Sequence, residues 1–259
     1  MFETIRIETD LRGVATLTLA RAEKHNSMSA TMIAELTAAA AELGADPAVR
    51  VVILTGEGAS FCAGGDLDWM RAQFTADRAT RIAEARKLAL MLKALNELPK
   101  PLIGRVQGQA FGGGIGMMSV CDVCIAVDGV KFGLTETRLG LIPATISPYV
   151  IARMGEGKAR RVFMSARLFD AAEARDLDLV ARVVTADELD AAIEREVKPY
   201  LAAAPGAVAR AKALARSLGT PITEAVIAAT IERLADCWED PEAHEGISAF
   251  FDKRKPAWL

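Results

Sequence analysis

Hydrophobic and polar positions change period several times along the 259-residue chain, which indicates a protein that mixes strands with helices. Residues 2–9 and 14–19 alternate around a short polar turn and predict a β-hairpin. A β-branched run at 49–55 ends beside a glycine and predicts a buried strand. Shorter runs predict further strands at 102–106, 123–127 and 131–134.

Helical periodicity fills most of the remaining sequence. Ser29 is a suitable N-cap for a helix that Gly44 would end, and apolar positions trace one face of a longer helix over 78–98. Further helices are expected at 114–120, 189–200, 207–217 and 223–238. We therefore predict an α/β fold, with a core over residues 1–196 and a helical appendage over 197–259.

Two glycine-rich loops each follow a strand-like run and lead into helix-like sequence. The first, at 61–66, reads Phe-Cys-Ala-Gly-Gly-Asp, and the second, at 111–114, reads Phe-Gly-Gly-Gly. Such loops leave backbone N–H groups open to a ligand, so the two could hold an oxyanion if they converge. The structural alternative is that Asp66 caps the next helix and that residues 112–114 allow close helix packing.

Composition restricts the class of protein. Hydrophobic residues make up 51% and charged residues 25% of the chain, and neither charge forms the long block of a nucleic-acid-binding tail. The N-terminus has no signal-peptide features, and the most apolar stretch, 112–127, is too short to span a bilayer. We therefore expect a cytoplasmic protein that binds neither nucleic acid nor membranes.

The chain has four cysteines and two histidines. Cys121 and Cys124 have the C-x-x-C spacing, but no second pair or nearby histidine completes a metal set. Their apolar surroundings favour buried thiols. No metal is expected.

Several separated motifs occur in one order along the chain, at 21–26, 61–67, 108–114, 121–122, 132–136, 140–143 and 250–256. Together they resemble the enoyl-CoA hydratase/isomerase (crotonase) superfamily nearly from end to end. The resemblance implies a spiral of ββα units followed by a helical region that packs subunits into a homotrimer or a dimer of trimers. It also implies an acyl-CoA substrate and no separate cofactor, because coenzyme A is part of the substrate.

The resemblance further implies the catalytic groups. In this superfamily the thioester oxygen binds between two backbone N–H groups, which correspond to those of Ala63 and Gly113, and one such donor is typically worth roughly 3 kcal/mol of barrier lowering. Hydratases of the family use two glutamates. This chain keeps only Glu136, because Gly116 occupies the other position. The structural alternative for Glu136 is a surface carboxylate paired with Arg138.

The substrate-binding and CoA-binding residues that the resemblance implies are Lys24, His25, Asn26, Gly64, Gly65, Asp66, Trp69, Tyr149 and Lys253. Core packing is the alternative for Trp69 and Tyr149, and a solvated helix end is the alternative for the basic segment around Lys253. A free carboxylate on the substrate could be recognised by Arg138, Ser147 or Tyr149.

Three functions fit this set. A single base suits an isomerase that converts a 3-enoyl-CoA to a 2-enoyl-CoA, so the chemistry alone favours isomerisation. Segments at 24–26, 66–70, 111–116 and 140–149 resemble bacterial 3-methylglutaconyl-CoA hydratases, which favours a hydratase of leucine degradation or fatty acid metabolism. The missing glutamate motivates a third hypothesis, a non-catalytic acyl-CoA-binding subunit.

Overall fold

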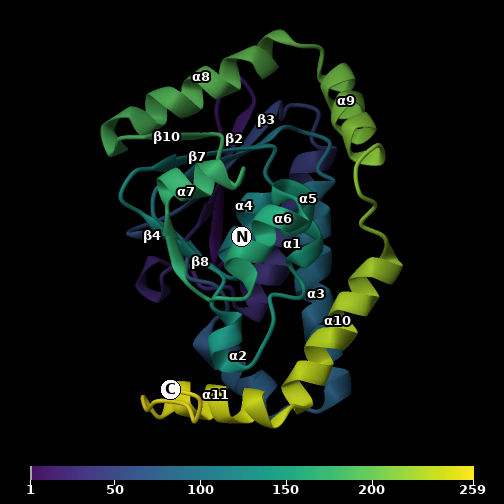
Figure 1. Cartoon of the computed structure of the whole chain (residues 1–259). Helices are drawn as coiled ribbons and strands as arrows, with labels where there is room; N and C mark the ends of the chain where they lie inside the picture. Colours follow the sequence, from purple (N-terminus) through teal and green to yellow (C-terminus); the bar gives the residue numbers. More distant parts are fainter. Residues whose placement is uncertain (1) are drawn as a thin grey trace.

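The computed structural model describes residues 2–259 and contains two sheets enclosed by helices (Figure 1). The larger sheet has the strand order β1-β2-β3-β5-β7-β10. Its strands are β1 (Ile5–Thr9), β2 (Val14–Leu19), β3 (Val51–Gly56), β5 (Leu102–Val106), β7 (Val123–Val127) and β10 (Arg182–Val184). β1 and β2 form the predicted antiparallel hairpin, and all other neighbours in this sheet are parallel.

A smaller sheet has the order β4-β6-β8-β9, in which only the last pair is antiparallel. Its strands are β4 (Ser60–Cys62), β6 (Gln109–Phe111), β8 (Lys131–Gly133) and β9 (Leu168–Asp170). The chain alternates between the sheets, because β3 leads to β4, β5 to β6 and β7 to β8 before helices follow. This repetition is the expected spiral of ββα units. The sequence pattern did not predict β4 and β6, which have only three residues each.

The first seven helices are α1 (Ala30–Ala45), α2 (Leu67–Thr75), α3 (Arg78–Asn96), α4 (Gly113–Val120), α5 (Ser147–Met154), α6 (Glu156–Phe163) and α7 (Ala171–Asp176). The Ser29 side chain caps α1 by accepting a hydrogen bond from the Met32 N–H, as predicted. Helix α4 is buried from its second residue to its last, in agreement with an almost uniformly apolar sequence. It therefore lies in the centre of the core, and its first turn belongs to the second glycine loop.

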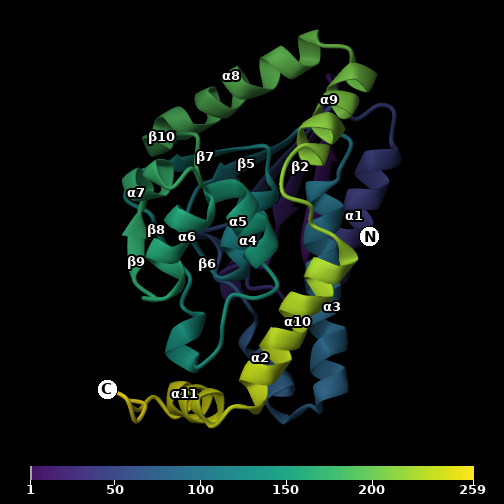
Figure 2. The same cartoon turned by 45° about the vertical axis from the view of Figure 1, so that its right-hand side comes forward.

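Four helices end the chain: α8 (Leu189–Ala202), α9 (Pro205–Ser217), α10 (Glu224–Glu239) and α11 (Pro241–Phe251). Figures 1 and 2 show them running along the outside of the molecule, with α10 beside α3. The boundary expected at residue 196 falls inside α8. Leu189, Ile193 and Val197 of this helix pack on the larger sheet, so the change in architecture comes only after α8 ends.

The cysteines of the C-x-x-C motif are free and buried in the core, as the apolar sequence around them predicted. Both thiols donate to carbonyl groups of α4, at 3.3 Å for Cys121 and 3.2 Å for Cys124. None of the helices within residues 2–259 has the length and hydropathy needed to cross a membrane.

Candidate active site

The two glycine loops converge because they follow neighbouring parallel strands, β4 and β6, at the same end of the smaller sheet. A Cβ atom placed on Gly64 would lie 3.2 Å from the carbonyl oxygen of Phe111, and Gly64 has a φ of +93°. Gly112 has a φ of +48°. These positions favour glycine because both the available space and the backbone conformation exclude most side chains.

Gly114 provides the tightest contact between the loops. A Cβ atom at this position would lie 2.5 Å from the backbone carbonyl oxygen of Cys62, which cannot move without disturbing β4. The first turn of α4 can therefore approach the end of β4 only if residue 114 has no side chain.

We predict that Gly114→Ala lowers the free energy of unfolding by about 1–3 kcal/mol, because the added methyl overpacks a rigid backbone contact. Gly157→Ala is a matched control, since a Cβ atom there meets nothing within 4 Å. We expect the control to be neutral or to stabilise α6 by up to about 1 kcal/mol. Urea unfolding of both variants checks this, and equal stability of the two would contradict it.

The free donor of the first loop is not the one that the sequence suggested. The Ala63 N–H donates to the carbonyl oxygen of His25 at 3.0 Å, so it is already used within the protein. Gly65 instead forms an isolated parallel bridge with Met28. Hydrogen bonds of 2.8 and 3.0 Å join Met28 to the peptide groups on either side of Gly65, which leaves the N–H of Gly65 itself directed to the opposite side of the strand.

The second loop supplies its donor at the start of α4. Gly113 is the first residue of that helix, and the N–H of a first helical residue has no partner within the helix. Gly65 and Gly113 both line one cavity of about 540 Å³. The structure thus brings together a pair of backbone donors, with Gly65 in the place expected for Ala63.

This cavity is mainly apolar. Helices α2, α3 and α10 contribute Trp69, Leu88 and Trp238 to its wall, and Phe250 of α11 also lines it. The sequence had suggested Trp69, whereas the contribution of the two C-terminal helices could not be anticipated without the three-dimensional arrangement. The charged residues among the lining side chains are Glu136 and Arg138.

Glu136 is the candidate acid–base group. It begins a short 3₁₀ helix, η2 (Glu136–Leu139), shortly after strand β8 of the smaller sheet. Its Oε2 atom is buried without a hydrogen-bond partner among residues 2–259, and its Oε1 atom lies 3.0 Å from the Cβ position of Gly112. Desolvation raises the pKa of Glu136 to about 7. Glu136 and Arg138, which the sequence suggested as a possible surface ion pair, do not form one among residues 2–259.

The raised pKa has a consequence for stability. Below the unfolded-state pKa of 4.5 the carboxyl is protonated in both states, but as the pH rises toward 7 the unfolded chain loses this proton first. Ionisation therefore destabilises the folded protein progressively over this range, and the effect levels off above pH 7.

We predict that Glu136→Gln is more stable than the wild type by about 2 kcal/mol at pH 8, and that the difference disappears near pH 4.5. This stability difference is smaller than the free energy that corresponds to the whole pKa shift, because the side chain is partly exposed and solvent screens its charge. Urea unfolding at several pH values measures the difference. Glu23→Gln, at an exposed position, serves as the control. A difference independent of pH would be inconsistent with a desolvated carboxyl.

The position of the missing glutamate is closed. A Cβ atom on Gly116 would lie 2.6 Å from Cγ2 and 3.1 Å from Cβ of Ile146. Ile146 therefore fills the volume that a side chain at residue 116 would need. Among the residues that line the cavity, no second carboxylate replaces the missing glutamate.

Two of the suggested binding residues have structural roles in the described chain. The Tyr149 hydroxyl donates to the carbonyl oxygen of Ala89 at 3.1 Å, and the side chain is 1% exposed and does not line the cavity. The buried Asn26 amide donates to the carbonyl oxygens of Glu57 and Ser60, both at 2.8 Å. These interactions hold the core and the first glycine loop rather than a ligand.

Asp66 also acts within the protein. Its carboxylate caps α2 by accepting from the Asp68 N–H at 2.9 Å and pairs with Arg21 at 3.0 Å. The side chain is only 4% exposed. The structure therefore supports the capping role of Asp66. It does not support a direct contact between Asp66 and the substrate.

The basic candidates lie outside the cavity. Lys24 and Lys253 are exposed, and neither lines it. His25 is exposed as well, with Nδ1 3.0 Å from the Ser60 hydroxyl oxygen.

Of the three residues suggested for a substrate carboxylate, only Arg138 lines the cavity. The Ser147 hydroxyl donates to the carbonyl oxygen of Pro143, and Tyr149 is in the core. Arg138 is exposed and forms no ion pair within residues 2–259. It is therefore available at the cavity as a cationic group.

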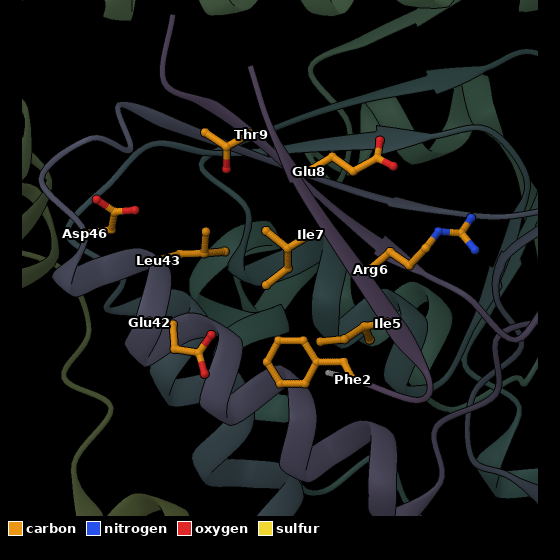
Figure 3. Close-up of a pocket in the computed structure, with 9 residues that line it drawn as sticks. All are labelled: Phe2, Ile5, Arg6, Ile7, Glu8, Thr9, Glu42, Leu43 and Asp46. Carbon is orange, nitrogen blue, oxygen red and sulfur yellow. The ribbon is translucent and has the colours of Figure 1, made fainter. Parts of the chain in front are cut away.

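A second cavity, of about 620 Å³, lies between the edge strand β1 and the C-terminal end of α1 (Figure 3). Its floor contains Ile5, Ile7 and Leu43, and the carboxylates of Glu42 and Asp46 lie on the α1 side. None of the site residues suggested by the sequence lines it. The cavity of about 540 Å³ is the candidate active site because it combines the two glycine loops with Glu136, whose Oε2 atom is buried without a partner in the described chain.

Comparison with known proteins agrees with this geometry. The family model for enoyl-CoA hydratase/isomerase matches residues 9–259. The probable enoyl-CoA hydratase echA8 of Mycobacterium bovis is 34% identical over 262 residues, which cover 98% of this chain and 97% of the relative. A putative enoyl-CoA hydratase of Thermus thermophilus is 31% identical, with 96% and 99% covered.

Solved structures give the same result. An enoyl-CoA hydratase from Shewanella pealeana superposes with a TM-score of 0.82 at 37% identity, covering 100% of this chain and 97% of that one. Pseudomonas aeruginosa AtuE gives a TM-score of 0.81 at 36% identity, with 99% of each chain covered. The chain therefore belongs to the enoyl-CoA hydratase/isomerase family of enzymes.

Proposed function

We propose that this protein adds water across the C2=C3 bond of a 2-enoyl-CoA thioester. The observation that carries the proposal is the carboxyl of Glu136, whose Oε2 atom is buried without a partner and which lines the same cavity as Gly65 and Gly113. Relatives named as enoyl-CoA hydratases support the choice of reaction. The apolar lining suits the acyl part of such a substrate.

In the proposed reaction the thioester oxygen accepts hydrogen bonds from the N–H groups of Gly65 and Gly113. The Glu136 carboxylate takes a proton from water as the water oxygen bonds to C3, and the C2=C3 electrons move toward the thioester oxygen. The two donors stabilise the resulting enolate. Glu136 then delivers its proton to C2, so one water is added and the carboxylate is restored.

A 3-enoyl to 2-enoyl-CoA isomerase is the second candidate. It is favoured by the closed position at Gly116, since isomerisation needs only one group that removes a proton from C2 and returns it to C4. Both candidates use the same donors and the same carboxyl. They differ in whether water attacks C3.

Incubation with three thioesters separates the candidates. Crotonyl-CoA should lose its enoyl absorbance and gain 18 Da, about the mass of one water, if the protein is a hydratase. 3-Hexenoyl-CoA should gain enoyl absorbance without a change in mass if it is an isomerase. No change with these substrates or with 3-methylglutaconyl-CoA would support a non-catalytic acyl-CoA-binding protein.

We predict that Glu136→Gln lowers kcat by about 10³-fold, within the range expected for loss of a general acid–base, while crotonyl-CoA still binds. The amide keeps the size of the side chain but cannot exchange a proton with the substrate. Stopped assays give the rate and isothermal titration calorimetry gives the affinity. Glu23→Gln is the control, and near-normal turnover by Glu136→Gln would exclude the proposed mechanism.

For the substrate itself we propose a 2-enoyl-CoA that carries a distal carboxylate, as 3-methylglutaconyl-CoA does. Arg138 supports this choice because it is a cation at the cavity without an ion-pair partner in the described chain. An arginine can bind a carboxylate through two parallel hydrogen bonds. A role in leucine degradation would follow from this substrate.

We predict that Arg138→Met lowers kcat/KM for 3-methylglutaconyl-CoA by roughly 10- to 100-fold, the value of a charged hydrogen bond, and changes that for crotonyl-CoA little. Arg195→Met, at an exposed position on α8, is the matched control. Steady-state kinetics with both substrates measure the ratio. An equal decrease in kcat/KM for both substrates would indicate that Arg138 binds the CoA part that they share and not the distal carboxylate.

We also propose that the protein works in the cytoplasm as a homotrimer or a dimer of trimers. The exposed side chains of Leu214 and Leu218, 61% and 80% accessible at the end of α9, support assembly through the C-terminal helices. Sedimentation equilibrium would give the subunit number directly.

A further inference from the structure

The closed position at Gly116 leaves the proposed hydration with one carboxyl. Ile146 fills the space beside Gly116 and is itself 2% exposed, so no water-sized group fits between them. An attacking water needs a second polar contact, because a single hydrogen bond to Glu136 does not fix the direction of its lone pair.

The neighbouring residue, Thr145, has an uncommitted hydroxyl. Thr145 lines the cavity and is 7% exposed, yet its hydroxyl forms no hydrogen bond with residues 2–259. The nearby Ser147 hydroxyl is different, because it donates to the carbonyl oxygen of Pro143. The Thr145 hydroxyl oxygen is not among the fully buried polar atoms without a partner, so it is accessible and can bind a water in the cavity.

The position of Thr145 in the chain follows from the same packing that closes the glutamate site. Residues 144–146 form the segment that enters α5, and all three are buried and line the cavity. Ile146 packs against α4 through Gly116, so the segment is held against the helix whose first turn provides the Gly113 donor. Thr145 is thereby fixed on a rigid part of the cavity wall.

We propose that the Thr145 hydroxyl accepts a hydrogen bond from the attacking water and directs its oxygen toward C3, a positioning role that rests on the proposed hydratase function. One O–H of the water donates to Thr145 while the other gives its proton to Glu136. The water oxygen bonds to C3, the C2=C3 pair moves to C2, and the proton held by Glu136 is transferred there. The threonine neither gains nor loses a proton.

This role separates two reactions at one site. Exchange of the C2 protons of a saturated acyl-CoA with solvent needs Glu136 and the backbone donors but no attack by water on C3. Hydration needs all of these groups and an oriented water. Loss of the Thr145 hydroxyl should therefore reduce hydration and leave exchange unchanged.

The test compares Thr145→Val, Thr145→Ser and the wild type. Crotonyl-CoA hydration should fall by about 10²-fold in Thr145→Val, the scale of a misplaced reactant, and return close to the wild-type rate in Thr145→Ser. Exchange of the C2 protons of butyryl-CoA in D2O, followed by NMR, should be the same in all three. Valine matches threonine in shape, and thermal melting confirms that each variant is folded.

Two further variants complete the experiment. Thr135 also lines the cavity, so Thr135→Val tests the other free hydroxyl, whereas Thr137 lies outside it and Thr137→Val is the matched control. Hydration lost in Thr135→Val but retained in Thr145→Val would overturn the proposal. So would equal losses of hydration and exchange in Thr145→Val. A wild type that exchanges C2 protons without hydrating crotonyl-CoA would overturn the hydratase function as well.

Discussion

The parallel pairing of β4 with β6 is the constraint on which the site depends. These strands have only three residues each, but they direct both glycine loops to the same end of the smaller sheet. The contact between Gly114 and the Cys62 carbonyl then holds the start of α4 against β4. Two backbone donors reach one cavity because the loops cannot separate without breaking this pairing.

The same loops explain why a carboxyl can remain buried without a partner. Asn26 and Asp66 use their polar atoms to fix the backbone around the first loop, and the Met28 bridge fixes Gly65. The protein thus satisfies these polar groups beside the cavity, whereas Oε2 of Glu136 has no hydrogen-bond partner among residues 2–259. The free energy lost by desolvating Glu136 is offset by this surrounding structure, as is usual for sites of chemistry.

The sequence predicted the larger elements well because their signals are local. Repeating apolar positions predicted α1, together with its Ser29 cap, and α3, and short strand-like runs predicted β5 and β7 with their observed bounds. The short strands β4 and β6 lack such a signal. The donor in the first loop was assigned to Ala63 because sequence alone does not show that the His25 carbonyl, distant by 38 residues, already accepts that N–H. Tyr149 was misplaced for the same reason, since its partner Ala89 is on another helix.

The closed position at Gly116 changes what is required of Glu136. With two carboxyl groups, one can remain a base while the other remains an acid. With one carboxyl, the proposed hydration requires the same group to be ionised before water attacks and protonated before C2 receives its proton. A pKa near 7 permits both states at neutral pH, whereas an ordinary glutamate would be almost entirely ionised. In the proposed hydration, burial without an ion-pair partner is therefore the feature that lets a single carboxyl serve both steps, and Arg138 forms no ion pair with Glu136 in the described chain.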